Sequence, residues 1–284
     1  MNPKNKYTSP AQTLRTQIVF LMLCIGSVYA QISVAPTILT IDSKTGIGNL
    51  FITNPSSAAQ EVSVDFMFGY PGGDNEGNLV MVYDDTVAAK TYSLDGSVRA
   101  YPKAFVLEAN KQQTIRIQAR IKDNRKDLFA FTRIKITSSQ KTADAGEKVT
   151  EGIGTTVNFK FDQIIPCFYW KGNVTTGIKV NDVQVKRDKE KLKFITDLER
   201  LGLAPFIGSM SAKLIDQSGK EAALREVTTA IYFSTKRNIE FDTKDVPNGK
   251  YRLVMKFETK RGDMAVSDIL QAPPVTIERT VTVQ

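Results

Sequence analysis

Among the residue types that could do chemistry, histidine is missing altogether from the 284 residues. Ser-His-Asp triads, Cys-His pairs and histidine metal sites are therefore excluded together. Cys167 lies in the apolar run IIPCFYW. A thiol in such surroundings is typical of an inert core residue rather than of a nucleophile. The residue types favour a protein that binds partners without catalysing a reaction.

The acidic residues lead to the same conclusion. The stretch GYPGGDNEGN at 69–78 carries Asp74 and Glu76. It lacks the spaced acidic ligands of a calcium loop, so we expect an ordinary mobile turn. Asp84 and Asp85 are adjacent, and in a strand adjacent side chains point to opposite faces. General acid–base catalysis needs two groups that converge. We expect no enzyme activity, no cofactor and no metal site.

The N-terminus has the order of a secretory signal peptide. Three basic residues precede the apolar run 18–25, and the small-residue stretch GSVYAQ follows it. Val28 and Ala30 occupy the positions that a signal peptidase reads, so we place cleavage after Ala30 and localise the mature protein to the periplasm. About eleven apolar residues are too few for a membrane anchor, which spans roughly 30 Å of hydrocarbon. The bulky LML before Cys24 argues against a lipoprotein.

Charge and length describe an ordinary exported protein. Removal of residues 1–30 takes away three basic residues and no acidic ones, which lowers the formal charge from +8 to about +5. Basic residues are interspersed with acids, as in KRDKEK at 186–191, so we expect neither nucleic-acid binding nor stable membrane insertion. A single remaining cysteine allows no internal disulfide. About 254 mature residues suit two domains.

Period-two apolar patterns bounded by Gly, Pro, Asn and Asp recur along the chain and predict an all-β protein. We expect two immunoglobulin-like β-sandwich domains in tandem, over 31–170 and 178–284. The strands expected in the first domain are Ile32–Ile41, Asn49–Thr53, Glu61–Tyr70, Leu79–Tyr83, Ala104–Leu107, Gln113–Ile121, Asp127–Ile136 and Thr155–Trp170.

The second domain has a corresponding set of patterns. Its expected strands are Lys179–Lys186, Leu192–Leu198, Ser209–Ile215, Thr228–Phe233, Ile239–Phe241, Tyr251–Thr259 and Val275–Val283. DQSGK at 216–220 predicts a hairpin, and VPNGKY at 246–251 places Tyr251 where a tyrosine corner is expected. KGNVTTG at 171–177 is the expected hinge.

Four segments of the first domain resemble the PapD-like periplasmic chaperones that assemble pili and fimbriae. They are ISVAPTILTID at 32–42, ITNPSSAAQEVSVDF at 52–66, AYPKAFVLEANKQQTIRIQ at 100–118 and NRKDLFAFTRIKI at 124–136. Each segment is a weak match, but the four occur in the family's order. The resemblance indicates a divergent member of that family.

This resemblance implies a mechanism, donor-strand complementation, in which an edge strand is lent to an incomplete client fold. The donor strand needs alternate large apolar side chains that face outward and free backbone groups. Val157, Phe159 and Phe161 alternate with polar residues at the fitting place. Because any half-buried strand alternates, these three side chains could instead face their own core.

The sequence departs from the family at its anchoring residues. Ile38 stands where the family has an arginine for the client's terminal carboxylate, and QIIPC lacks the corresponding lysine. Lys126 and Trp170 replace the interdomain salt bridge. If a carboxylate is still anchored, the expected substitutes are Arg133, Lys135 and Lys160, although each could be an ordinary solvated base.

Two functions therefore stay open. The first is a periplasmic chaperone of pilin-like or surface-appendage subunits, which would work with an outer-membrane assembly pore. The second is an exported immunoglobulin-like binding or structural module of the cell surface, because a scaffold can be kept while its use changes.

Overall fold

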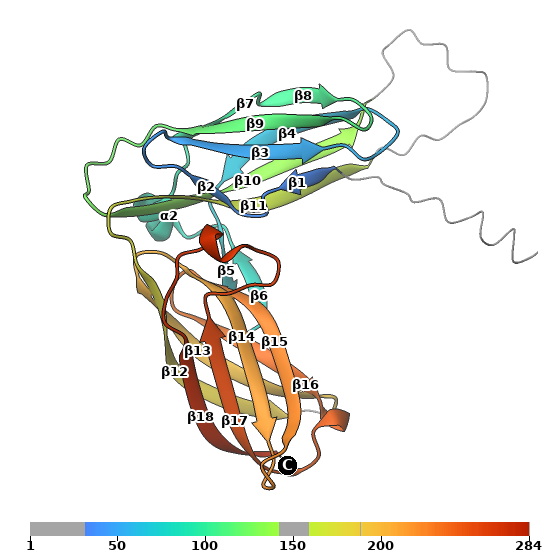
Figure 1. Ribbon diagram of the computed structural model, residues 1–284, viewed down its shortest axis with the longest axis vertical. Coiled ribbons are helices and arrows are strands. Elements are labelled where there is room, and N and C mark those ends of the chain that lie inside the picture. The colour runs from blue at the N-terminus through green and yellow to red at the C-terminus, as the bar shows by residue number, and fades with distance from the viewer. Residues whose placement is uncertain (1–31, 142–158, 188, 284) are drawn as a thin grey trace, which may run out of the picture.

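The computed structural model describes residues 32–141, 159–187 and 189–283, which form two immunoglobulin-like β-sandwich domains in tandem (Figure 1). The first sandwich consists of β1 (Ser33–Ala35), β2 (Leu39–Ile41), β3 (Ile47–Thr53), β4 (Gln60–Met67), β7 (Val98–Tyr101), β8 (Ala104–Leu107), β9 (Gln112–Ala119), β10 (Leu128–Gln140) and β11 (Lys160–Lys171). One of its sheets has the order β1-β3-β9-β7 and the other β2-β11-β10-β4-β8. All-β architecture was correctly predicted from the period-two patterns.

The second sandwich consists of β12 (Thr176–Arg187), β13 (Lys191–Gly202), β14 (Phe206–Ile215), β15 (Glu221–Ile231), β16 (Thr235–Asp242), β17 (Gly249–Glu258) and β18 (Val275–Val283), with two short 3-10 turns at Thr243–Asp245 and Val266–Asp268. Its sheets have the orders β12-β13-β16 and β15-β14-β17-β18. The predicted DQSGK hairpin joins β14 to β15. Tyr251 is 7% exposed and its hydroxyl donates to the Pro247 carbonyl at 2.8 Å, as expected of a tyrosine corner.

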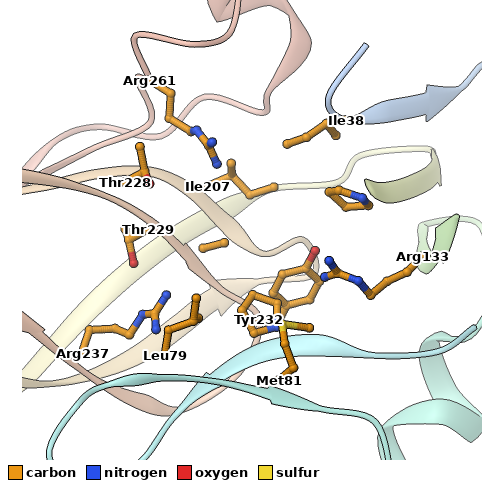
Figure 2. A pocket seen from close by; sticks show the side chains of 13 residues that line it. Ile38, Leu79, Met81, Arg133, Ile207, Thr228, Thr229, Tyr232, Arg237 and Arg261 are labelled. Atoms are coloured by element: carbon orange, nitrogen blue, oxygen red, sulfur yellow. The ribbon is translucent and has the colours of Figure 1, made fainter. Parts of the chain in front are cut away.

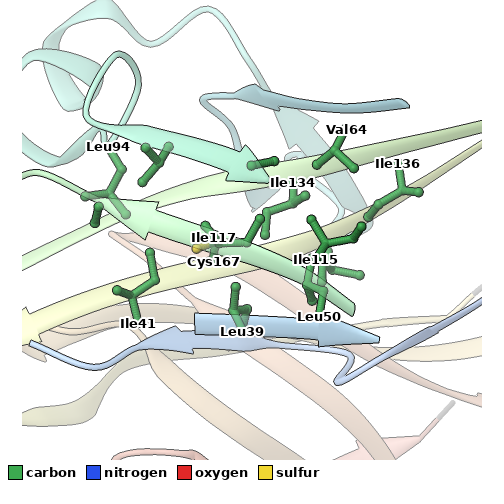
Figure 3. Packing of buried hydrophobic residues seen from close by; sticks show 14 of the residues in the cluster. Leu39, Ile41, Leu50, Val64, Leu94, Ile115, Ile117, Ile134, Ile136 and Cys167 are labelled. Carbon is green, nitrogen blue, oxygen red and sulfur yellow. The ribbon is translucent and has the colours of Figure 1, made fainter. Parts of the chain in front are cut away.

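Each sandwich encloses its own apolar core. In the first, side chains from both sheets interdigitate, among them Leu50, Ile117, Ile134 and Cys167 (Figure 3). Cys167 has no exposed surface, and burial raises the pKa of its thiol. The prediction of an inert core cysteine is therefore confirmed.

One expectation for the start of the chain is wrong. The segment Ile32–Ile41 is not one strand, because β1 pairs with β3 in one sheet and β2 pairs with β11 in the other. Pro36 lies between β1 and β2 and has no N–H to continue a ladder. The chain therefore crosses from one sheet to the other at this point.

Asp84 and Asp85 do not lie in a strand, contrary to prediction. They precede helix α2 (Thr86–Tyr92). Asp85 caps the first turn of this helix: its Oδ1 atom accepts a hydrogen bond from the Ala88 N–H at 2.9 Å. The helix is only seven residues long, too short for its period to stand out in the sequence.

The segment 69–78 is more ordered than a mobile turn. Tyr70–Gly73 forms β5, which pairs with β6 (Leu79–Val82) as a separate two-stranded hairpin. The hairpin leaves the first sandwich and lies against the second. The Asn238 N–H of β16 donates to the Gly77 carbonyl at 3.0 Å, and Lys186 of β12 pairs with Glu76 at 2.6 Å. In the described residues, no group of three or more acidic or cysteine side chains is placed to hold a metal ion.

A third apolar cluster lies between the sandwiches. Phe131 of β10 is within 5.0 Å of Phe68 and 4.9 Å of Tyr232, measured between ring centroids. Residues 172–175 connect β11 to β12. The Asn173 N–H donates to Asp127 Oδ1 at 2.6 Å, which fastens the connection to the first sandwich. The first sandwich lies crosswise at one end of the second (Figure 1). Packed aromatic rings fill their junction.

Candidate functional site

The first half of β11 is an edge. Lys160–Lys171 pairs with β10 along its length, from Lys160 opposite Ser139 to Lys171 opposite Leu128. On the opposite side β2 pairs only with residues 167–169. Within the described ranges no strand covers residues 160–166 on that side. On that side the Gln163 side chain donates to the Ile32 carbonyl at 2.6 Å. An uncovered strand edge offers backbone groups to another chain.

Two aromatic side chains lie at the start of this edge. Phe159 is 64% exposed and Phe161 is half-buried, and their rings stack at 6.1 Å between centroids. By strand alternation they share the face of Ile165 and Cys167, which points toward the core. On β11 the core cluster ends at Ile165, and neither ring belongs to it. Val157, the third residue predicted for this stripe, lies outside the described residues.

The three predicted bases do not come together. Arg133 and Lys135 lie two residues apart on β10, and Lys160 is opposite Ser139. Six residues of strand separate Arg133 from Ser139, which is about 20 Å. Lys135 pairs with Asp162 at 2.8 Å, and the hydrogen bond between them raises the pKa of Lys135. The bases form a row along the sheet, not a cluster that could hold one carboxylate.

Arg133 instead lines a cavity between the sandwiches (Figure 2). Arg237 of β16 and Arg261, which follows β17, line the same cavity. Sequence analysis missed both, because no local pattern distinguishes an arginine in the second sandwich from any other surface base. Only the packing of one sandwich on the other brings these three side chains together.

The departures from the family pattern lie in the same junction. Ile38 is 8% exposed and belongs to the apolar cluster between the sandwiches, as does the partly buried Trp170. An apolar side chain in place of an arginine therefore packs the junction. None of the helices in the described ranges has the length and apolar character that crossing a bilayer requires.

Comparison with solved structures finds similar folds. The chain is similar to the YadV chaperone, with 14% identity and a TM-score of 0.46 over 89% of this chain and 99% of that one. It is similar to the Pseudomonas aeruginosa CupB2 chaperone, with 11% identity and a TM-score of 0.42 over 88% and 100% of the two chains.

A third similar structure is the Salmonella enterica SafA pilin in complex with the SafB chaperone, with 14% identity and a TM-score of 0.40 over 89% of this chain and 98% of that one. No protein-family model matches the sequence, and no curated protein matches it.

Proposed function

We propose that the chain is a periplasmic chaperone that binds incomplete pilus or surface-appendage subunits and lends them the free edge of β11. The observation that carries this proposal is the combination of an uncovered edge at 160–166 with the exposed, stacked rings of Phe159 and Phe161. Backbone groups of the edge would supply affinity, and the two rings would enter pockets of the client. Export would follow from the signal peptide expected at residues 1–30.

The proposal accounts for two rings that lie outside the core cluster. Burying a phenylalanine stabilises a protein by roughly 1.5–3 kcal/mol relative to leaving it in water. Phe159 is mostly exposed, so its ring provides little of this stabilisation within its own chain. A complex in which a client covered both rings would gain most of this stabilisation from each ring. Large exposed apolar side chains next to a free strand edge are also an aggregation risk, which a protein keeps only where they are used.

The test replaces Phe159 and Phe161 together by serine. We expect the melting temperature to stay within about 2 °C of wild type, because neither ring belongs to the core cluster. Periplasmic proteins that co-purify with the wild-type chain should be lost, since each ring contributes roughly tenfold or more to affinity. The matched control is Phe51→Ser, which changes a 41% exposed ring on β3.

The outcomes separate the open functions. Loss of co-purifying proteins from the double variant, but not from Phe51→Ser, supports strand donation. A collapse of the melting temperature would show that the two rings stabilise the first sandwich. Unchanged stability with unchanged partners would indicate a surface module that does not use this edge.

A further inference from the structure

Strand β6 pairs with another strand along one side only. The β5–β6 hairpin is a two-stranded sheet of its own, in which Leu79–Val82 pairs with Tyr70–Gly73. Within the described ranges no strand pairs with the other side of β6. The backbone N–H and C=O groups of a strand point alternately to its two sides, so those on the outer side of β6 are open to pairing with another strand.

The side chains of this edge are apolar and exposed. Leu79 is 59% exposed and Val80 is 41% exposed, and Tyr83, which directly follows the strand, is 44% exposed. Met81 and Val82 between them are half-buried. A single exposed apolar side chain is ordinary, but five consecutive apolar residues with this exposure are not. Such a group on a strand edge indicates a surface that another chain covers.

The edge also lacks the features that usually prevent pairing. Proteins protect exposed edges with charged side chains, with proline or with a bulge. The segment GNLVMVY at 77–83 contains no charged residue and no proline, and β6 pairs with β5 without a register shift. By contrast, the edge strands of the second sandwich, β12, β15, β16 and β18, all carry charged side chains. Pairing is therefore opposed at those edges and unopposed at β6.

The charge pattern fits a second copy of the same edge. In antiparallel pairing about a two-fold axis at Met81, Val80 of each copy faces Val82 of the other. Asp84 is the charged residue nearest to the strand, and in this register it faces the uncharged Asn78. Like charges that face each other across a pair of strands destabilise it, but this register brings none together over residues 78–84. A two-fold contact of this kind also closes at two copies.

We propose that the outer edge of β6 is a self-association site, at which two copies of the chain pair antiparallel and join their hairpins into one sheet. Backbone hydrogen bonds and the apolar side chains of residues 79–83 hold the two copies together. Two short strands bury less than the roughly 1,200–2,000 Å² of a stable interface, so the dimer is reversible, with a dissociation constant of about 1–100 µM. The proposal goes beyond strand donation, which uses β11 and not β6.

Sedimentation equilibrium of the mature chain over about 1–300 µM tests the proposal, because this range brackets the expected dissociation constant. The average mass should rise from that of a monomer towards that of a dimer and no further. Val80→Lys combined with Val82→Lys should abolish the dimer, since the introduced lysines face each other between the copies. Val80→Lys combined with Val82→Glu should keep it, since each lysine then faces a glutamate of the other copy.

Three comparisons serve as controls. The two double variants place the same number of charges on the hairpin, so a difference between them does not come from a general loss of hairpin structure. Leu224→Lys changes a 54% exposed side chain on β15 and should dimerise like the wild type. Replacement of Phe159 and Phe161 by serine should also leave the dimer unchanged, which separates pairing through β6 from association through β11.

Four outcomes would overturn the proposal. A wild type that stays monomeric at every concentration shows that β6 does not pair with itself and leaves this edge to a different protein. A dimer that the two-lysine variant retains lies elsewhere on the molecule. A dimer that both double variants lose contradicts the antiparallel register. A dimer that is lost when Phe159 and Phe161 are replaced depends on β11 instead.

Discussion

Phe159 and Phe161 show what the period-two pattern of the sequence can and cannot predict about a single residue. The period-two pattern predicts that they lie on one face of a strand, two residues apart. Phe161 lies in β11 and Phe159 directly precedes it. The pattern does not indicate whether the sandwich core extends to them, because that depends on where the facing strands end. In the structure Phe161 is opposite Ser138 of β10. On β10 and β11 the core cluster stops at Ile136 and Ile165, whereas on β4 it continues to Val62, opposite Ser138. Cys167 and Tyr251 were correctly predicted as core residues, the first from the apolar run IIPCFYW and the second from the turn VPNGKY.

Asp85 links the helix cap to the junction. Its Oδ1 atom accepts from the Ala88 N–H, and its Oδ2 atom accepts from the Tyr70 hydroxyl at 2.6 Å. The Ala88 bond and then the Tyr70 bond lower the pKa of the Asp85 carboxyl, against a smaller opposing effect of burial. No signal in the sequence pairs residues 70 and 85, since the contact depends on the hairpin between them.

The sign of the Asp85 effect on stability follows from this direction. A carboxyl whose pKa is lower in the folded state stabilises the fold above its unfolded pKa, about 3.9, and loses that contribution as the pH falls through the folded value. We predict that Asp85→Asn has a lower melting temperature than wild type at pH 7, and that the difference shrinks as the pH falls below about 4. Melting curves from pH 7 to pH 2 measure it. A difference in melting temperature that does not change with pH would contradict a stabilising role of the ionised Asp85 carboxyl.

At the level of elements, the sequence patterns locate some edge strands well and others poorly. Ala104–Leu107 and Val275–Val283 have the predicted bounds. β15 begins at Glu221, seven residues before the predicted Thr228, because its first half is mostly exposed and polar and shows no apolar alternation. β7, at Val98–Tyr101, was missed. An edge strand needs few apolar residues, so its pattern in the sequence is weak.

The β5–β6 hairpin is the element that was hardest to predict from the sequence. A glycine in this hairpin allows its close approach to β16. A Cβ atom on Gly73 would overlap the Lys236 carbonyl oxygen, whereas a Cβ atom on Gly262 would meet nothing within 4 Å. Backbone atoms cannot move aside as a flexible side chain can. The hairpin therefore contacts the second sandwich only because residue 73 has no side chain.

We predict that Gly73→Ala detaches or shifts the hairpin and lowers the free energy of unfolding by about 1–3 kcal/mol, the usual cost of forcing extra atoms into a packed site. Gly262→Ala should leave it unchanged within about 0.5 kcal/mol. Urea unfolding of both variants measures the difference, and limited proteolysis should show faster cleavage within residues 74–79 of Gly73→Ala alone. Equal stability and equal cleavage of the two variants would contradict this account.

At the level of the whole molecule, two sandwiches were predicted but their junction was not. KGNVTTG at 171–177 was expected to act as a hinge. In the structure this segment is hydrogen-bonded to both sandwiches. The Asn173 N–H donates to Asp127 of the first sandwich, and the Thr175 carbonyl accepts from the Ala204 N–H of the second at 3.1 Å. Contacts between residues more than one hundred positions apart, such as Arg200 with Tyr92 at 3.1 Å, depend on the assembled fold. Two of the cavity arginines, Arg237 and Arg261, could not be predicted from the sequence for the same reason.

The central claim is that residues 160–166 of β11 pair with a client through their uncovered side, and amide hydrogen exchange tests it most directly. Exchange is measured on the free mature chain and on the complex isolated by co-purification from the periplasm. Amides that point away from β10 should exchange quickly in the free chain and be protected in the complex, because a paired strand withholds them from water. The edge strand β15 is the matched control and should exchange equally in both. A complex in which residues 160–166 exchange as fast as in the free chain would contradict strand donation.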